Sequence, residues 1–228
     1  MIVYNTIVGL AAGVALVLIA ELLRKLGNGE KVLSEGYALG FGMTGFILTV
    51  LGITISVMWP CNKVLHANIL MGEPALAFGV LLAAASFFLW RRRELFDDLG
   101  QGNEKSERAI AYLVAVLRPV SVWIFATGLM MAWLTAAILY YHLGNAPPQE
   151  PIIGHFSQSW LEPSFLGLLW GLTALGALLF PAAVVNWNGK VLMLARICWG
   201  VAGVLLVLFS AVNYFTHIGL LMNTFDSL

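Results

Sequence analysis

The chain has 228 residues, of which 60% are hydrophobic and 11% are charged, and its mean hydropathy is +0.88. Soluble domains carry roughly 25% charged residues because their surfaces face water. This composition excludes a water-soluble globule and predicts an integral membrane protein. The formal net charge of +0 gives no indication of a nucleic-acid partner, and we expect the lipid bilayer to be the main partner.

Six apolar runs are long enough to cross a hydrocarbon core about 30 Å thick, which needs roughly 20 residues per helix. Runs of this length are too long for barrel strands, and helices satisfy their own backbone hydrogen bonds in lipid. The first run has no basic residue before it and no small-residue cleavage site, so we expect a retained helix rather than a signal peptide. The prediction is an all-α, polytopic bundle of six transmembrane helices, a single domain over residues 1–228, with helices at about residues 3–23, 36–59, 66–90, 119–142, 163–186 and 192–217.

The positions of Lys and Arg predict the orientation, because cytoplasmic loops are enriched in them. Eleven of the 12 Lys and Arg residues follow the first, third and fifth runs or begin the next one, and only Lys63 lies on the other side. Both termini are therefore expected outside the cytoplasm.

The segment between the third and fourth runs begins with three arginines, residues 91–93, directly after a span. In that position they are typical of an anchor to anionic lipid rather than of a nucleic-acid site. Residues 94–108 mix both signs of charge and predict a solvated loop. Residues 109–117 either extend the fourth helix inward or lie in the membrane interface, and Pro119 can begin the span.

Small residues predict where the helices touch, because lipid offers no hydrophobic drive for helix association. The pairs Gly9–Gly13 and Gly167–Gly171 have the G-x-x-x-G spacing. These faces pack either inside one bundle or between subunits. We expect the protein to form a homo-oligomer. The two cysteines, Cys61 and Cys198, lie in opposite halves of the membrane and are read as ordinary thiols.

All four histidines fall on the predicted outer side of the membrane: His66, His142, His155 and His217. Histidine titrates between pH 5 and 8, so this group is a candidate sensor of external acidity. Imidazole also binds copper and zinc, and a haem is a further alternative at the outer side. The other interpretation is that these side chains are simply in contact with water at helix ends.

The stretch HANILMGEP, residues 66–74, determines where the third helix begins. A helix from Pro74 to Trp90 is short for a full span, whereas one from His66 places Glu73 about 10 Å deep at 1.5 Å per residue. A carboxylate at that depth needs a partner or a water-filled cavity. We therefore expect Glu73 to face a hydrated cavity between the third and sixth helices. The alternative is that Glu73 lies in a solvated turn.

The sixth helix carries a polar stripe on its outer half: Ser210, Asn213, Tyr214 and His217. These side chains either hydrogen-bond between helices or line an outer vestibule together with Glu73 and His66. Residues 144–163 would then lie over the vestibule like a lid. Trp170 lies deeper in the membrane. Its side chain either narrows a path for solute or only packs between helices.

The segment HANILMGEPALAFGVLL, residues 66–82, resembles a widespread uncharacterised family of six-span prokaryotic membrane proteins, which implies a prokaryotic plasma membrane. It is also similar to the third-helix signature of the acid-gated urea and short-chain amide channels, in which a G-P-A stretch precedes F-G. The matching residues are Gly72, Pro74, Ala75, Phe78 and Gly79. That second resemblance covers about a third of the chain and implies six spans, outward termini and a hexameric ring.

The chain departs from the channel pattern in three places. The aromatic residue expected one turn after Trp170 is replaced by Ala174, and the last helix has Cys198-Trp199-Gly200 where a carboxylate is expected. The long outer loop follows the fourth helix rather than the second. The resemblance therefore does not imply selectivity for urea. It implies only a narrow path for a small neutral solute.

The predicted function is a channel or facilitator for a small neutral solute of the urea, amide or ammonia class, with no cofactor. No H-E-x-x-H, G-x-S-x-G or phosphate-cradling glycine motif is present in the sequence, so no enzyme is predicted. The alternative is an accessory subunit of a larger membrane redox complex, either structural or binding haem or metal through His66, His142 and His217.

Overall fold

The computed structural model describes residues 4–61, 64–97, 99, 104–157, 159–187 and 189–225. This part of the chain is helical and contains no β-strand, which confirms the predicted all-α class. The elements in chain order are α1 (Tyr4–Gly27), α2 (Ser34–Met58), α3 (Leu65–Arg91), α4 (Arg93–Asp97), α5 (Glu104–Tyr141), η1 (Ile153–Phe156), α6 (Leu161–Val185) and α7 (Lys190–Phe225).

Six of these helices are long and apolar enough to cross a membrane, as predicted: α1, α2, α3, α5, α6 and α7. Two of them, α5 and α7, extend well beyond the predicted bounds. The helix α5 begins at Glu104, so residues 109–117 continue the fourth span inward and Pro119 lies inside the helix. The 36 residues of α7 correspond to about 54 Å at 1.5 Å per residue, longer than a hydrocarbon core of about 30 Å.

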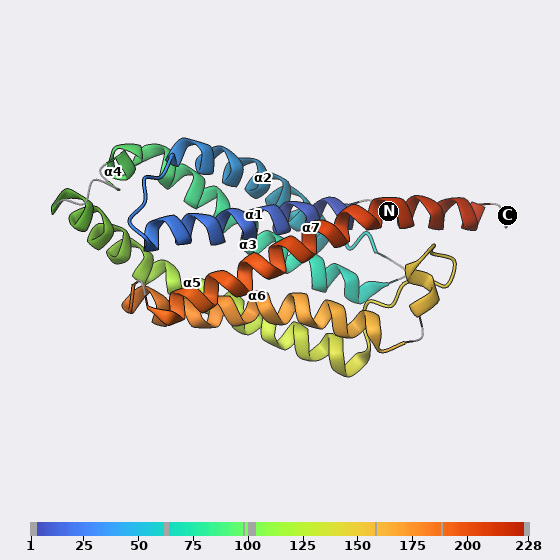
Figure 1. Ribbon diagram of the computed structural model, residues 1–228. Helices are drawn as coiled ribbons and strands as arrows, with labels where there is room; N and C mark the ends of the chain where they lie inside the picture. Colours follow the sequence, from blue (N-terminus) through green and yellow to red (C-terminus); the bar gives the residue numbers. More distant parts are fainter. Residues whose placement is uncertain are drawn as a thin grey trace.

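Successive long helices alternate in direction, which gives the bundle two chemically different ends (Figure 1). The start of α1, the end of α7, the α2–α3 connection and the loop 142–160 lie together; we call this the histidine end because it carries all four histidines. The other end carries α4 and the α1–α2 and α6–α7 connections; we call it the basic end after Arg24, Arg91, Arg92, Arg93, Lys105 and Lys190. Lys63 lies outside the described residues.

At the basic end, Arg24 joins the end of α1 to the following turn. Its guanidinium lies 2.8 Å from Glu21 Oε2 and 2.7 Å from Glu30 Oε1. The Asn28 amide and the Arg24 guanidinium hold the pKa of Glu30 below its usual range. Arg93 Nη1 lies 3.7 Å from Glu35 Oε1, which ties the start of α4 to that of α2.

The helices pack as the pairs α2–α3, α5–α6 and α1–α7, and small residues let the backbones approach closely. A Cβ atom on Gly13 of α1 would lie 2.8 Å from the Gly203 carbonyl oxygen of α7. A Cβ atom on Gly52 of α2 would lie 2.4 Å from the Leu76 nitrogen of α3. Gly167 of α6 faces Leu139 of α5. At these positions the small residues make contacts inside one bundle, the first of the two alternatives that the spacing left open.

The apolar core is divided into two clusters that meet at α1. One cluster joins α1 to α2, α3, α4 and the first turns of α5, with Phe41 and Leu48 among its most buried members. The other joins α1 to α5, α6 and α7, with Leu169 and Val184 fully buried. The helices α3 and α5 contribute side chains to both clusters. These two helices face each other with few contacts.

Candidate ligand cavity

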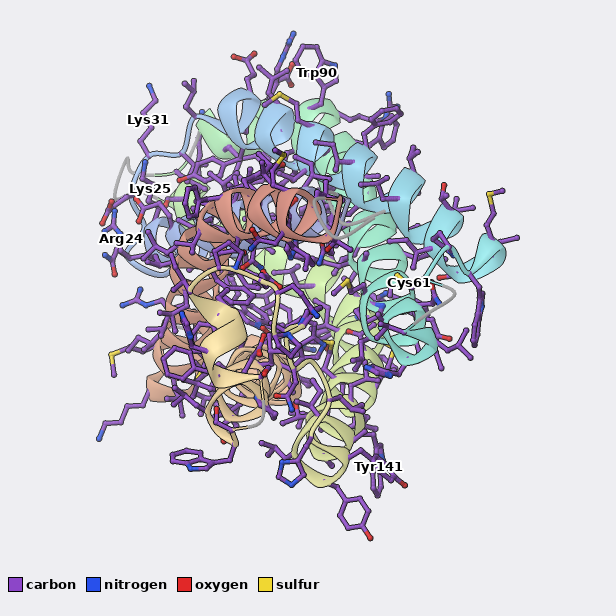
Figure 2. The ribbon with its side chains drawn as sticks, turned by 90° about the vertical axis from the view of Figure 1, so that its right-hand side faces the viewer. Arg24, Lys25, Lys31, Cys61, Trp90 and Tyr141 are labelled. Atoms are coloured by element: carbon purple, nitrogen blue, oxygen red, sulfur yellow. The ribbon has the colours of Figure 1, made fainter. Side chains whose placement is uncertain are left out.

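A cavity of about 1020 Å³ lies between α3 and α5, and residues of α1, α6 and α7 complete its wall. Seen from the histidine end, Cys61 lies on the α3 side and Tyr141 on the α5 side (Figure 2), and both residues line the cavity. Ligand pockets commonly measure about 300–1,000 Å³, so this volume suits a molecule far larger than urea.

The polarity of the cavity changes along its length. At the basic end its lining is apolar, with Leu26, Phe88, Phe96 and Leu117 as representatives. At the histidine end it includes the polar residues Asn5, His66, His142, Asn145, Glu150, Glu162, Ser210, Asn213 and His217. Among the described residues that line it there is no Lys or Arg. The two ends therefore favour different chemical groups.

Glu150, in the loop after α5, is 5% exposed and closes the cavity at the histidine end. The Thr216 hydroxyl of α7 donates to Glu150 Oε1 at 2.5 Å, and His217 Nε2 lies 3.5 Å from the same oxygen. The Gly154 amide donates to the Glu150 carbonyl oxygen at 3.0 Å. Glu150 thus fastens the loop to α7.

Three further contacts hold this loop over the cavity. Asn223 Nδ2 donates to the Gln149 carbonyl oxygen at 2.8 Å. A Cβ atom on Gly219 of α7 would lie 2.3 Å from Pro151 Cγ, so only glycine lets the loop come this close. Ala146 is buried against the cavity. Residues 144–157, which we call the lid, take the position that the sequence predicted for the loop.

Glu162, in the first turn of α6, is the second buried carboxylate and is 9% exposed. The Ala146 amide of the lid donates to Glu162 Oε2 at 2.7 Å. The lid is therefore attached to α6 through Glu162 and to α7 through its own Glu150.

The predicted polar stripe of α7 divides between the cavity and the rest of the bundle. Ser210, Asn213 and His217 are buried and line the cavity. Tyr214 is half-buried and does not line the cavity. The successive turns of a helix bring residues 210, 213 and 217 to one face, and residue 214 stands at the edge of that face.

Three buried polar atoms of lining residues have no hydrogen-bond partner among the described residues: Asn5 Oδ1, Trp170 Nε1 and Asn213 Oδ1. A buried polar atom without a partner costs free energy, so each such atom indicates a contact with water or a ligand. Trp170, predicted to lie on the path, lines the cavity in the middle of the bundle.

The histidines were expected to act as one group, but the structure separates them. His66, His142 and His217 line the cavity, whereas His155 is exposed in η1 and does not. Within the described ranges, no three His, Cys, Asp or Glu side chains gather closely enough to hold a metal ion. Cys61 is half-buried and Cys198 is buried.

Glu73 does not face the cavity, which corrects the expectation from the sequence. The longer third helix is correct, since α3 begins at Leu65 and contains Pro74. However, the Glu73 side chain is exposed on the outer surface of the bundle and does not line the cavity. Gly72 packs against Ile55 and Ser56 of α2, and this contact turns the next residue away from α7.

The two carboxylates that do line the cavity, Glu150 and Glu162, were missed as site residues by the sequence analysis. A signal for them was present: residues 119–189 contain these two acidic side chains and no Lys or Arg. A carboxylate with no basic neighbour in the sequence needs a hydrogen-bond donor or a cation from elsewhere.

A model of the family described as "Protein of unknown function (DUF981)" matches residues 1–219. No curated protein and no solved structure matches the chain. The similarity to urea and amide channels therefore remains a hypothesis that rests on Gly72, Pro74, Ala75, Phe78 and Gly79. The resemblance to an uncharacterised family of six-span membrane proteins is confirmed: the chain belongs to the DUF981 family.

Proposed function

We propose that this membrane protein binds an amphipathic molecule, with the polar group at the histidine end and the apolar body between α3 and α5. The observation that carries this proposal is the polarity of a single large cavity, which is polar under the lid and apolar toward the basic end. Apolar surface removed from water contributes about 25 cal/mol per Å², so an apolar wall favours hydrocarbon. The role is binding or transfer of the molecule rather than catalysis.

The solute facilitator predicted from the sequence is the second candidate. It is favoured by the vestibule at the histidine end, where His66, Ser210, Asn213 and His217 line the cavity. A path for a polar solute needs hydrogen-bonding groups along its length. The lining near Leu26 and Phe96 offers apolar side chains, so an amphipathic ligand fits the whole cavity better. Flux of urea into vesicles that exceeds the flux into protein-free vesicles would favour the facilitator.

A role as an accessory subunit of a redox complex is the third candidate, and it would use His66, His142 and His217. These three line one cavity, but among the described residues no three His, Cys, Asp or Glu side chains gather closely enough for a copper or zinc ion, so a haem held by one or two histidines is the form of this candidate that remains. An absorption band of the purified protein in the visible range would support this role.

Filling the cavity tests the main proposal. Ala77 of α3 lines the cavity, whereas Ala84, two turns further along the same helix, is exposed and does not. We expect Ala77→Trp to reduce the amount of retained amphiphile about tenfold, the factor that corresponds to 1.4 kcal/mol of binding free energy. The measurement is mass spectrometry of the small molecules that stay with the protein after purification, normalised to protein. Ala84→Trp is the matched control and should retain as much as the wild type. Equal retention in both variants would contradict the proposal.

The proposed orientation places the basic end in the cytoplasm of a prokaryotic cell and both termini outside. In a chain carrying Cys61→Ser and Cys198→Ser, we expect Lys105→Cys to react with an impermeant maleimide only in inside-out vesicles. Gln149→Cys should react only in intact cells. Both side chains are exposed, at the basic and the histidine end respectively. The reverse pattern would overturn the orientation.

A homo-oligomer is favoured by Glu73, a carboxylate exposed inside a helix that crosses the membrane. A charged side chain that faces lipid costs several kcal/mol, and a second copy of the chain would remove that contact. The mass of the protein in nanodiscs tests this, and a monomer would contradict it.

A further inference from the structure

We propose that the polar end of the cavity recognises a cation, an ammonium group carried on an apolar body, through Glu150, Glu162 and Asn213. This inference rests on the proposed function and adds the chemical class of the ligand. The geometry behind it is the convergence, at one end of one cavity, of two buried carboxylates and a buried amide oxygen.

The first step concerns charge. The described titratable side chains that line the cavity are Glu150, Glu162, His66, His142, His217, Cys61 and Tyr141, without a Lys or an Arg. A protonated His217 would balance Glu150, whose Oε1 lies 3.5 Å from Nε2. Glu162 would then have the Ala146 amide as its donor, and within the described ranges no ion pair joins it to His66 or His142, the other histidines of the lining. A buried carboxylate in that position favours either a proton or a cation from the ligand.

The second step concerns hydrogen bonding and does not depend on the carboxylates. Asn213 is 8% exposed and lines the cavity, and its Oδ1 atom is buried without a donor from the described residues. Asn5 Oδ1, also at the histidine end, is likewise buried without a donor from the described residues. An ammonium group has up to three donors and no acceptor, so it complements a site rich in acceptors.

The third step separates an organic cation from other ligands. No group of three His, Cys, Asp or Glu side chains among the described residues could hold a metal ion, so a bound metal is not what these residues favour. Phosphate and carboxylate head groups are recognised by Arg and Lys, and the described lining contains neither. The apolar remainder of the cavity suits a hydrocarbon body, which a free inorganic cation lacks.

The test compares head groups on one hydrocarbon chain. Wild-type protein in phosphatidylcholine nanodiscs is titrated at neutral pH with dodecylamine, dodecanol or dodecanoate, and protein-free nanodiscs correct for partition into lipid. We expect dodecylamine to bind at least about tenfold more tightly than dodecanol, because charge-assisted hydrogen bonds are roughly twice as strong as neutral ones, and dodecanoate to bind most weakly.

Two variants assign the preference to the carboxylates. Glu162→Gln and Glu150→Gln should each remove the tenfold preference for the amine, while dodecanol binding is kept. Glu73→Gln is the matched control, because Glu73 is a carboxylate on the outer surface of the bundle. It should bind all three probes like the wild type. If Glu150→Gln does not fold because the lid is lost, Glu162→Gln and the wild-type series decide the question.

The outcomes separate this inference from the proposed function. Equal binding of dodecylamine and dodecanol by the wild type would overturn the ammonium site and leave an amphiphile-binding cavity. Binding of none of the three probes would overturn both. A preference that survives in Glu162→Gln and Glu150→Gln would also overturn the assignment. A salt control gives the last outcome. If sodium chloride displaces dodecylamine and choline chloride at equal ionic strength does not, the site binds a small cation and the inference is overturned.

Discussion

Replacing Gly52 by alanine is expected to lower the free energy of unfolding by about 3 kcal/mol, near the upper end of the range for atoms added to a packed interior. The new Cβ atom would lie 2.4 Å from the nitrogen, 2.7 Å from the Cα and 2.9 Å from the Cβ of Leu76. Two of these are backbone atoms, which cannot move aside as a side-chain tip can. The helices α2 and α3 would have to separate, and α3 is one wall of the cavity.

The measurement is unfolding in mixed micelles as the fraction of sodium dodecyl sulfate is raised. Gly200→Ala in α7 is the control, because its Cβ atom would lie 3.5 Å from Ala20 Cβ, an ordinary contact. Alanine in a helix is favoured over glycine by roughly 0.5–1 kcal/mol, so this control should be neutral or slightly stabilising. If both variants lost the same stability, the close contact between α2 and α3 would be wrong.

Replacing Thr216 by valine is expected to loosen the lid by about 2 kcal/mol, within the range for hydrogen bonds to charged groups. Valine keeps the shape of threonine but removes the hydroxyl that donates to Glu150 Oε1 at 2.5 Å. Glu150 would then depend on His217 at 3.5 Å, in a place where its carboxylate is 4% exposed.

Hydrogen–deuterium exchange measures this effect on the lid directly. Amide exchange in residues 146–157 should speed up about thirtyfold, since each 1.4 kcal/mol is a factor of ten. Thr54→Val is the control, because the exposed Thr54 hydroxyl donates to the Val50 carbonyl oxygen of its own helix. Unchanged exchange in the lid of Thr216→Val would show that other contacts fasten it to α7.

The number of spans and the lid could be predicted from the sequence because they follow from local properties. The length of each apolar run determines whether it can cross the membrane, and the loop 144–163 is polar and rich in proline. The polar stripe of α7 was also readable, because Ser210, Asn213 and His217 are polar positions in an apolar helix. All three line the cavity.

The rotation of α3 could not be predicted, and Glu73 was therefore placed on the wrong side. A helix that is apolar all round has no single face that its sequence directs toward the core. The contacts of Gly72 and Gly79 with α2 determine the rotation, and these depend on the partner helix. The roles of Glu150 and Glu162 depend on contacts 66 and 16 residues away in the chain, with Thr216 and Ala146 respectively.

The most direct measurement of the central proposal is a high-resolution electron cryomicroscopy structure of the protein in nanodiscs made with its native lipids. We expect an elongated density between α3 and α5 that ends beside Glu150, Glu162 and Asn213. A continuous file of ordered water from the histidine end to the basic end, without such a density, would contradict amphiphile binding and favour a path for a small polar solute.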